Sequence, residues 1–329
     1  MRAKTFSKFA KQIPLSWLPF ADAASADLPW ARLLRLSLFK FTMGVTTALM
    51  IGTLNRVMIV ELGVAAWLVS MMLALPLLVA PFRAVTGYRS DVHVSAFGWR
   101  RVPYMWGGTL IQFLGLAVMP FALLVLSGGG AVAVPSWVGP GAAAIAFLMV
   151  GAGLQTSQTA GLALATDQAS EETRPRVVTM LYTMLLVGAV SGSLIYSYLL
   201  ADFTPEILVQ VVQGTAMAVL VLNAIALWKQ EARNPQRVAA MRAEVRRPFK
   251  DAWADFVALP QAKRFLFATA LGTMAFHMQD IVLEPYGGEI LHLSVGATSA
   301  LTAMLATGGL MGFYVAGRQL AKQVDPMRV

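Results

Sequence analysis

The chain has 329 residues, of which 57% are hydrophobic and 13% charged, with a net charge of +9 and no cysteine. Soluble domains carry about 25% charged residues, so this composition cannot cover a water-facing surface. The lack of cysteine excludes disulfides, thiolate metal sites and cysteine nucleophiles. We therefore expect an integral membrane protein.

Apolar runs of about 20 residues recur along the chain, and each is long enough to cross the hydrocarbon layer as a helix. Backbone amides in lipid must pair within their own segment, and the runs lack the alternation of barrel strands. The predicted fold class is therefore all-α, a polytopic membrane helix bundle. The sequence predicts eight spans, at residues 39–60, 67–85, 104–126, 142–165, 178–199, 208–227, 265–283 and 295–316.

Residues 1–30 precede the first span and lack the short apolar core of a signal peptide. They combine lysines with large aromatic residues, a composition typical of segments that lie in the membrane interface. We predict a cytoplasmic interfacial arm. The residues that support it are Lys4, Lys8, Lys11, Trp17, Phe20 and Trp30.

Charge differs sharply between alternate loops. The basic side contains Arg89, Arg100, Arg101, Arg174, Arg176, residues 229–264, Arg318 and Lys322, and the acidic side contains Glu61, Asp202, Glu206, Glu284 and Glu289. The positive-inside rule makes the basic side, and with it the N-terminus, cytoplasmic. The positive net charge therefore reflects topology, and we expect no nucleic-acid partner.

A pattern near the first span recurs near the seventh. Asn55 and Arg56 precede Gly63 as Gln279 and Asp280 precede Gly287, 224 residues further on. The loops after the second and eighth spans are related by about the same offset. We predict a first six-span repeat at residues 31–228, a basic cytoplasmic linker at 229–264, and the start of a second repeat at 265–329.

Six-span repeats with an acidic, glycine-containing turn between spans two and three resemble the major facilitator superfamily. The turn contains Asp91, Gly98, Arg100 and Arg101. The resemblance implies a twelve-span bundle, whose second unit would need about 100–150 further residues. We therefore expect this eight-span chain to be truncated.

Longer stretches resemble one branch of that superfamily, the PucC and LhaA family of light-harvesting complex assembly proteins in photosynthetic bacteria. These stretches are LPFADAASADLP (18–29), GTLNRVMIVELG (52–63), YRSDVHVSAFGWRRVPY (88–104), GLALATDQASEETRPRVV (161–178) and MQDIVLEPYGG (278–288). The resemblance implies antenna polypeptides as partners, with the reaction-centre antenna complex as a further one, and bacteriochlorophyll as a bound or delivered pigment. It also implies residence in the photosynthetic inner membrane.

Ionisable residues near the end of the seventh span are candidates for a pigment site. His277, Asp280 and Glu284 share one helical face. A neutral imidazole at His277 can ligate a chlorin magnesium, or it can simply hydrogen-bond across helices. Gln279 and Asn55 are alternative oxygen donors, and Asp280 and Glu284 can equally be wet interfacial carboxylates.

Other polar positions favour structural roles. Arg56 and Asp280 are equivalent in the two repeats, so we predict that they pair as a latch. We expect Asp91 to meet a helix end or an arginine, and Arg100 and Arg101 to contact lipid headgroups. Gln155 and Gln158 of the fourth span are predicted to pack between helices.

Glycine pairs at four-residue spacing mark possible docking positions for an antenna helix or a pigment tail. The pairs are Gly188 with Gly192 and Gly308 with Gly312.

The predicted function is assembly of light-harvesting complexes, with transport of a small solute as the alternative and a structural antenna subunit as a third reading. A transporter should keep polar groups around a cavity between spans one, four and seven, whereas an assembly factor should offer apolar grooves. The sequence contains no nucleotide loop, metal-ligand cluster or Ser-His-Asp pattern in a credible context, so we expect no enzyme and no protein-ligated metal.

The topology is testable with reporter fusions. We expect fusions at Gly129 and Phe203 to report periplasmic locations, and fusions at His93 and Arg237 to report cytoplasmic ones, because basic loops stay inside. A reversed pair would contradict the span assignment.

Overall fold

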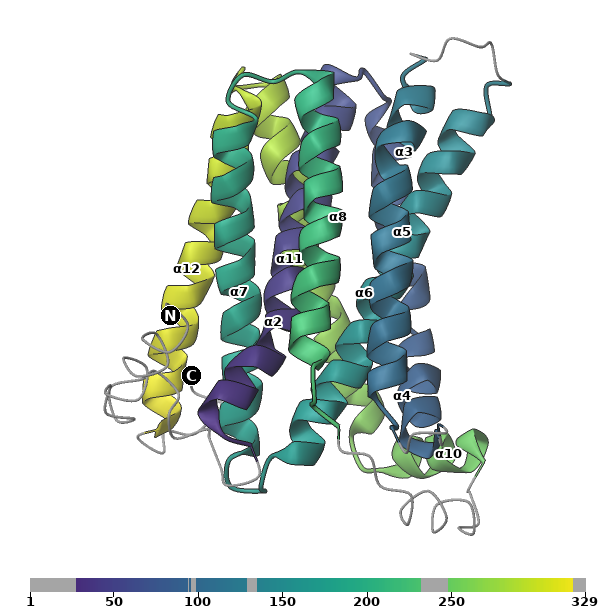
Figure 1. Cartoon of the computed structure of the whole chain (residues 1–329), viewed down its shortest axis with the longest axis vertical. Helices are drawn as coiled ribbons and strands as arrows, with labels where there is room; N and C mark the ends of the chain where they lie inside the picture. Colours follow the sequence, from purple (N-terminus) through teal and green to yellow (C-terminus); the bar gives the residue numbers. More distant parts are fainter. Residues whose placement is uncertain (1–27, 94, 96–98, 129–134, 232–247, 322–329) are drawn as a thin grey trace, which may run out of the picture.

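The structure, a computed structural model, describes residues 28–93, 95, 99–128, 135–231 and 248–321 (Figure 1). Within these ranges all regular structure is helical, and eight helical stretches are long and apolar enough to cross a membrane. The predictions of an all-α membrane bundle and of eight spans are confirmed. Gly98 and most of the predicted interfacial arm lie outside the described residues.

Eight spans follow one another in chain order. Span 1 comprises α2 (Trp30–Thr47), η3 (Ala48–Leu54) and η4 (Val57–Glu61), and span 2 comprises α3 (Ala66–Val79) and α4 (Phe82–Val92). Spans 3 to 6 are α5 (Val102–Leu126), α6 (Val138–Gln168), α7 (Arg174–Leu199) and α8 (Pro205–Leu227). The short α10 (Phe249–Ala258) precedes spans 7 and 8, which are α11 (Ala262–Glu289) and α12 (Val295–Ala321).

The first span begins earlier than predicted. Helix α2 starts at Trp30, directly after Pro29, whose φ of −59° suits a helix entry. The prediction placed this start at residue 39 because Arg32 and Arg35 interrupt the apolar run. Arg32 is instead held within the protein, where its Nε donates to Oε1 of Gln230 at 3.2 Å.

Local sequence signals explain several helix ends. Thr204 caps α8 by accepting a hydrogen bond from the amide of Ile207, and Pro205 occupies the first helical position. Span 2 breaks between α3 and α4, where Pro81 has no amide hydrogen to donate. Gly63 and Gly128 follow η4 and α5 with positive φ values of 64° and 76°, which only glycine adopts without strain.

Glycines bring span 1 and span 5 into backbone contact. A Cβ atom on Gly44 would collide with the carbonyl oxygen of Leu185, and one on Gly188 would collide with that of Phe41. Such close approach is how small residues drive helix association in lipid. Gly188 therefore serves packing within this chain and is not free to dock an antenna helix, whereas Gly308 and Gly312 of α12 face open space.

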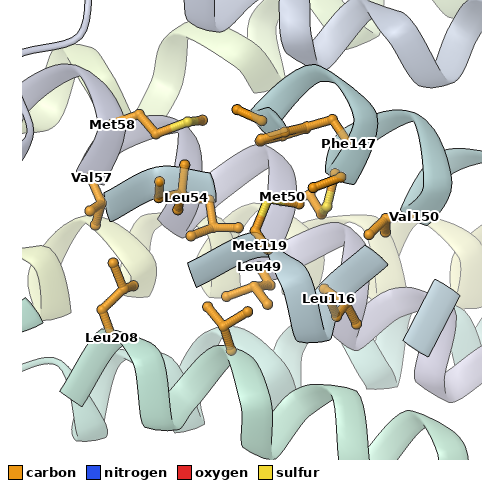
Figure 2. Packing of buried hydrophobic residues seen from close by; sticks show 14 of the residues in the cluster. Leu49, Met50, Leu54, Val57, Met58, Leu116, Met119, Phe147, Val150 and Leu208 are labelled. Atoms are coloured by element: carbon orange, nitrogen blue, oxygen red, sulfur yellow. The ribbon is translucent and has the colours of Figure 1, made fainter. Parts of the chain in front are cut away.

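The apolar core fills the space between spans 1 to 6. Figure 2 shows part of its larger cluster, in which Leu49, Met50 and Leu54 of span 1 lie among side chains of the surrounding helices. A second cluster packs around Phe39 and Met43, nearer the start of α2. Span 1 is thus the central helix of the described bundle.

Buried polar side chains tie span 1 to spans 3 and 6. Thr42 donates to Oδ1 of Asn223 at 2.7 Å, and Asn223 Nδ2 donates to Thr109 at 3.0 Å. One turn further along, Gln112 donates to Thr46 at 2.8 Å. Each group finds its partner inside the protein, as groups remote from water must.

The seventh and eighth spans pack on the first six. Helix α12 lies beside α7 at one edge of the bundle (Figure 1), where Gly296 approaches the carbonyl oxygen of Ser197. Helix α11 contacts η3 and η4. The structure thus joins the start of the predicted second repeat to span 1 and span 5.

The described part of the linker before span 7 contains the amphipathic helix α10. Its Phe249 ring lies 5.6 Å from the ring of Tyr88 in α4, with Trp253 beside it. The basic residues 232–247 of the predicted linker lie outside the described residues.

Substituting the contact glycine should destabilise the bundle. Gly188→Ala places a methyl group against the α2 backbone, so we expect the free energy of unfolding to fall by about 1–3 kcal/mol. In the control Gly214→Ala, the new methyl meets open space in α8, and helix propensity should stabilise by up to about 1 kcal/mol. Denaturant unfolding in detergent measures both. Equal effects would contradict the packing role.

Candidate functional site

A buried polar cluster lies where span 1 meets spans 7 and 8. We call it the repeat seam and define it by Thr53, Asn55, Arg56, Glu284, Ser299 and Thr302. All except the half-buried Thr302 are buried. Groups of this kind inside a membrane protein are costly, so the repeat seam is a candidate functional site.

The backbone of span 1 is unusual at the repeat seam. Two π-helical segments, η3 and η4, flank Asn55 and Arg56. π-Helices are rare and occur often at functional sites. Their i→i+5 bonding also suits the ion pair between Arg56 and Glu61, which are five residues apart, with 2.5 Å between Nη1 and Oε1.

Arg56 does not form the predicted pair with Asp280. Its Nη1 pairs with Glu61, and its Nη2 donates to the carbonyl oxygen of Leu293 at 2.9 Å. A π-helical turn contains an extra residue, so equivalent positions in span 1 and in the α-helical span 7 need not face one another. Arg56 still connects span 1 to the loop between α11 and α12, and the specific latch prediction was wrong.

Glu284 is not the wet interfacial carboxylate that one reading allowed. Its side chain is 1% exposed, and its Oε1 accepts a hydrogen bond from Thr302 and lies against Gly52. Asn55, 0% exposed, donates from Nδ2 to the carbonyl oxygen of Ile281 at 2.6 Å. Both side chains lie between helices, so neither faces a space for a pigment ring, contrary to prediction.

Unlike Asn55 and Glu284, which are buried between helices, His277 lies on the outside of α11. Its side chain is half-exposed, with Nδ1 3.6 Å from Oδ2 of Asp280. Gln279 is exposed nearby. An apolar stripe, which we define by the exposed side chains at three- and four-residue spacing along α11, runs beside the histidine: Phe267, Leu271, Met274, Met278 and Val282.

These residues fit the group that the resemblance implies. A chlorin magnesium takes an axial nitrogen ligand, and Asp280 at Nδ1 leaves the Nε2 atom of His277 for that purpose. The apolar stripe offers the surface that a large, mostly apolar ring requires. Of the predicted donors, His277 and Gln279 are accessible.

An ion network joins helix ends at the side predicted to be cytoplasmic. Arg101 pairs with Asp91 and also with Asp167, at 3.2 Å between Nε and Oδ2. Arg100 pairs with Asp167 at 3.1 Å. The prediction that Asp91 meets an arginine is confirmed, while Arg101 is buried among protein groups and does not contact headgroups.

Glu231 completes this network at the start of α5. Its carboxylate oxygens accept the backbone amides of Arg100, Arg101 and Val102 at 2.8, 3.1 and 3.2 Å. An anion at a helix N-terminus is stabilising, so the end of span 6 is fastened to span 3. Sequence analysis missed this contact because 129 residues or more separate its partners.

The polar segment of span 4 mostly packs within the bundle. Ser157 donates to the carbonyl oxygen of Met105 at 3.1 Å, and Thr159 accepts from Nε of Arg83 at 3.1 Å. Gln155 and Gln158 are half-buried, and Oε1 of Gln155 lacks a hydrogen-bond partner among the described residues.

Sequence analysis also missed Lys40. This side chain is 0% exposed, and its Nζ lies 4.4 Å from the centroid of the Tyr182 ring, a cation–π contact. The predicted span began at residue 39, which assigned the lysine to the interface. The helix-start signal at Pro29 and Trp30 would have placed it in the third turn.

We predict that Arg56 contributes more than Asp280 to the stability of the protein, and removing each charge in turn tests this. We expect Arg56→Ala to cost about 3 kcal/mol, because it strands Glu61 and removes the contact to Leu293. Asp280→Asn disrupts a half-exposed pair and should cost no more than about 1 kcal/mol. Accumulation in the membrane and unfolding in detergent measure both, and an equal loss would count against the repeat seam as a structural contact.

Comparison with known proteins agrees with the family resemblance. The family described as "PUCC protein" matches residues 53–329. Protein PucC of Rhodobacter capsulatus is 54% identical over 99% of this chain and 71% of its own length. Protein PucC of Rhodovulum sulfidophilum is 52% identical over 94% of the chain and 69% of its own length.

A more distant relative is the "Bacteriochlorophyll synthase 44.5 kDa chain" of Rhodobacter capsulatus, 27% identical over 89% of this chain and 65% of its own length. No solved structure matches. The match to the family over residues 53–329, with relatives above 50% identity along nearly the whole sequence, shows that this multi-pass membrane chain belongs to the PucC family.

Proposed function

We propose that this protein is an assembly factor for bacterial light-harvesting antenna complexes, which holds bacteriochlorophyll on α11 and passes it to antenna polypeptides. Membership of the PucC family supports the assembly role. The name of the bacteriochlorophyll synthase relative supports a connection with the pigment. The observation that carries the pigment site is the half-exposed His277, backed by Asp280 and bordered by the apolar stripe.

The chain's own residues supply binding and orientation. Bacteriochlorophyll, when bound, would supply a magnesium ion, and the Nε2 atom of His277 would be the nitrogen that holds it. Asp280 keeps a proton on Nδ1 and so orients the imidazole. The apolar stripe covers the ring, at about 25 cal/mol per Å² before binding costs. Burial thus sets affinity, and the histidine sets orientation.

Surfaces for antenna polypeptides lie at the edge of the bundle. Gly308 and Gly312 of α12 are exposed and meet no neighbouring atom within 4 Å, so a partner helix can approach their backbone closely. We place the protein in the photosynthetic inner membrane, among lipids, with the N-terminus in the cytoplasm. It acts without chemically changing the pigment and is not an enzyme in this proposal.

An apolar groove on another face agrees with lateral binding. The groove has a volume of about 250 Å³ and lies between α7 and α8, against Val45 of span 1. Its hydroxyl groups are already paired, because Tyr196 and Thr215 lie 3.0 Å apart. A groove of this composition suits an acyl or isoprenoid chain and not a polar solute.

Transport of a small solute is the second candidate, favoured by a specific observation. Lys40 of span 1 and Oε1 of Gln155 in span 4 are buried polar groups without hydrogen-bond partners in the described structure. A transporter keeps such groups to meet its substrate. Neither span 1 nor span 4 presents a described carboxylate at that depth, so the substrate would be anionic or neutral.

His277→Phe tests the pigment site. We expect the purified variant to show reduced or shifted bacteriochlorophyll absorption while it stays folded, since the imidazole ring of His277 is half-exposed. The control is His292→Asn, which removes an exposed imidazole outside the helical spans at a position of positive φ (53°) that asparagine tolerates. Absorption spectra normalised to protein measure pigment content.

Capture of antenna polypeptides and solute uptake decide between the two functions. The assembly proposal expects newly made antenna polypeptides to co-purify with the protein, and antenna content to fall without loss of pigment synthesis when the gene is deleted. Purified wild-type protein without pigment or antenna polypeptide, together with saturable solute uptake by proteoliposomes, would replace this proposal with the transporter.

A further inference from the structure

Two hydrogen-bond acceptors in the repeat seam have no partner in the described structure. They are Oε2 of Glu284 and Oδ1 of Asn55, and each belongs to a side chain that is at least 99% buried. The other polar atoms of the two side chains are satisfied, by Thr302 and by the carbonyl oxygen of Ile281. A buried acceptor without a donor is destabilising, so each requires an explanation.

The two acceptors belong to one helix contact. Gly52 touches the Glu284 carboxylate, and Asn55 follows Gly52 by three residues in span 1. Ile281, which Asn55 contacts, precedes Glu284 by three residues in α11. Both side chains therefore fill the same turn of the interface between span 1 and α11.

Glu284 also lacks an ion-pair partner. Arg56, the cation of the repeat seam, pairs through Nη1 with Glu61 at 2.5 Å and donates through Nη2 to the carbonyl oxygen of Leu293, while its buried Nε has no hydrogen-bond partner in the described structure. From α12, the hydroxyl group of Thr302 donates to Glu284, and that of Ser299 lies 3.1 Å from the hydroxyl of Thr53.

The remaining charged groups of α11 are directed elsewhere. His277 and Asp280 pair with each other on its outside, Glu289 is exposed, and Lys263 and Arg264 are exposed at its start. The described charged groups at the seam are therefore Arg56 and Glu284, with Glu61 beside them. Their formal charges sum to one uncompensated negative charge.

We propose that the repeat seam binds one monovalent cation, a sodium ion or a proton, between the Glu284 carboxylate and the Asn55 amide oxygen. A single positive charge balances the site, and carboxylate, amide and hydroxyl oxygens are the donors that hard cations prefer. A proton on Oε2 donates to Oδ1 of Asn55 and satisfies both acceptors with one hydrogen bond. A sodium ion is coordinated by the same two oxygens.

Occupancy of this site stabilises the contact between the predicted repeats. Its donors come from span 1 and α11, and Thr302 of α12 holds the carboxylate in place. The two π-helical segments lie on either side of Asn55, where irregular helices of membrane proteins often bind ions. The inference rests on the repeat seam and is independent of the pigment site on the outside of α11.

Thermal unfolding of the full chain in detergent tests the proposal. One arm varies sodium against choline chloride at constant ionic strength, and the other varies pH from about 5 to about 9 without sodium. A sodium site raises the unfolding temperature by roughly 2–4 °C for each tenfold increase above the dissociation constant. A proton site instead shows the infrared carbonyl band of a protonated carboxylic acid, with no dependence on sodium.

Variants assign the effect to Glu284. Glu284→Gln, which carries its own N–H donor for Asn55, should fold and should lose the sodium dependence or the carboxylic acid band. Glu289→Gln, at an exposed glutamate of the same helix, should retain it. Asn55→Ala should weaken sodium binding at least about tenfold, or shift the carboxylic acid band.

The proposal fails if wild-type protein shows neither a sodium effect nor a protonated carboxylic acid, or if Glu284→Gln keeps the wild-type response. The wild-type measurements and Asn55→Ala decide the matter even if Glu284→Gln does not accumulate. Loss of pigment binding in His277→Phe leaves these results unchanged, so the two proposals fail separately.

Discussion

The hydrocarbon layer offers no hydrogen-bond partner, and the rest of this structure depends on that constraint. It selects helices for every span, and it requires each polar side chain between them to find a partner in the protein. Neutral groups meet the requirement in the hydrogen-bonded series of Thr42, Asn223 and Thr109. The two terminal nitrogens of Arg56 meet it with Glu61 and a backbone carbonyl, whereas its Nε has no partner in the described structure. Where partners are lacking, at Glu284, Asn55 and Lys40, the structure identifies candidates for function.

The span pattern could be predicted from the sequence because span length depends on hydropathy alone. All eight spans were confirmed. Their ends differ from the predicted ones by at most seven residues, except at the start of α2, which lies nine residues earlier, at Trp30 against the predicted residue 39. The contacts between helices were harder to predict from the sequence. Gly188 is recognisable as a small residue, but only the structure shows that it meets Phe41 in span 1. The sequence contains no visible signal for the π-helical segments, which arise from packing.

The sequence predicted which residues belong to the candidate site, but not how they are arranged. Asn55, Arg56, His277, Asp280 and Glu284 were all selected as costly polar groups in apolar runs. The structure places Asn55, Arg56 and Glu284 at the contact of span 1 with α11, and His277 and Asp280 on the outside of α11. Their division between the inside and the outside of α11 depends on helix phase. A π-helical turn in span 1 rotates the side chains that follow it about the helix axis. The offset of 224 residues between the repeats therefore predicts how deep a residue lies in the membrane, but not which residue it contacts. Glu61, which was assigned to the loop after the first span, is the last residue of η4.

One helix connects the two proposed sites, which gives the arrangement a physical consequence. His277 and Glu284 are seven residues apart on α11, about 10 Å along the axis at 1.5 Å per residue. Between them, the carbonyl oxygen of Ile281 lacks an amide donor in α11, because Pro285 has no N–H, and it accepts the hydrogen bond from Asn55 of span 1. Charge neutralisation at Glu284 tightens the contact of α11 with span 1, since an unpaired buried carboxylate opposes it. His277 and the apolar stripe lie on the same helix as Glu284, so a displacement of α11 at the repeat seam would displace them too. Cation binding at the repeat seam would change the affinity for the pigment only if bacteriochlorophyll bound the cation-occupied and the empty protein with different affinities. A ligand with equal affinity for two states does not shift the equilibrium between them.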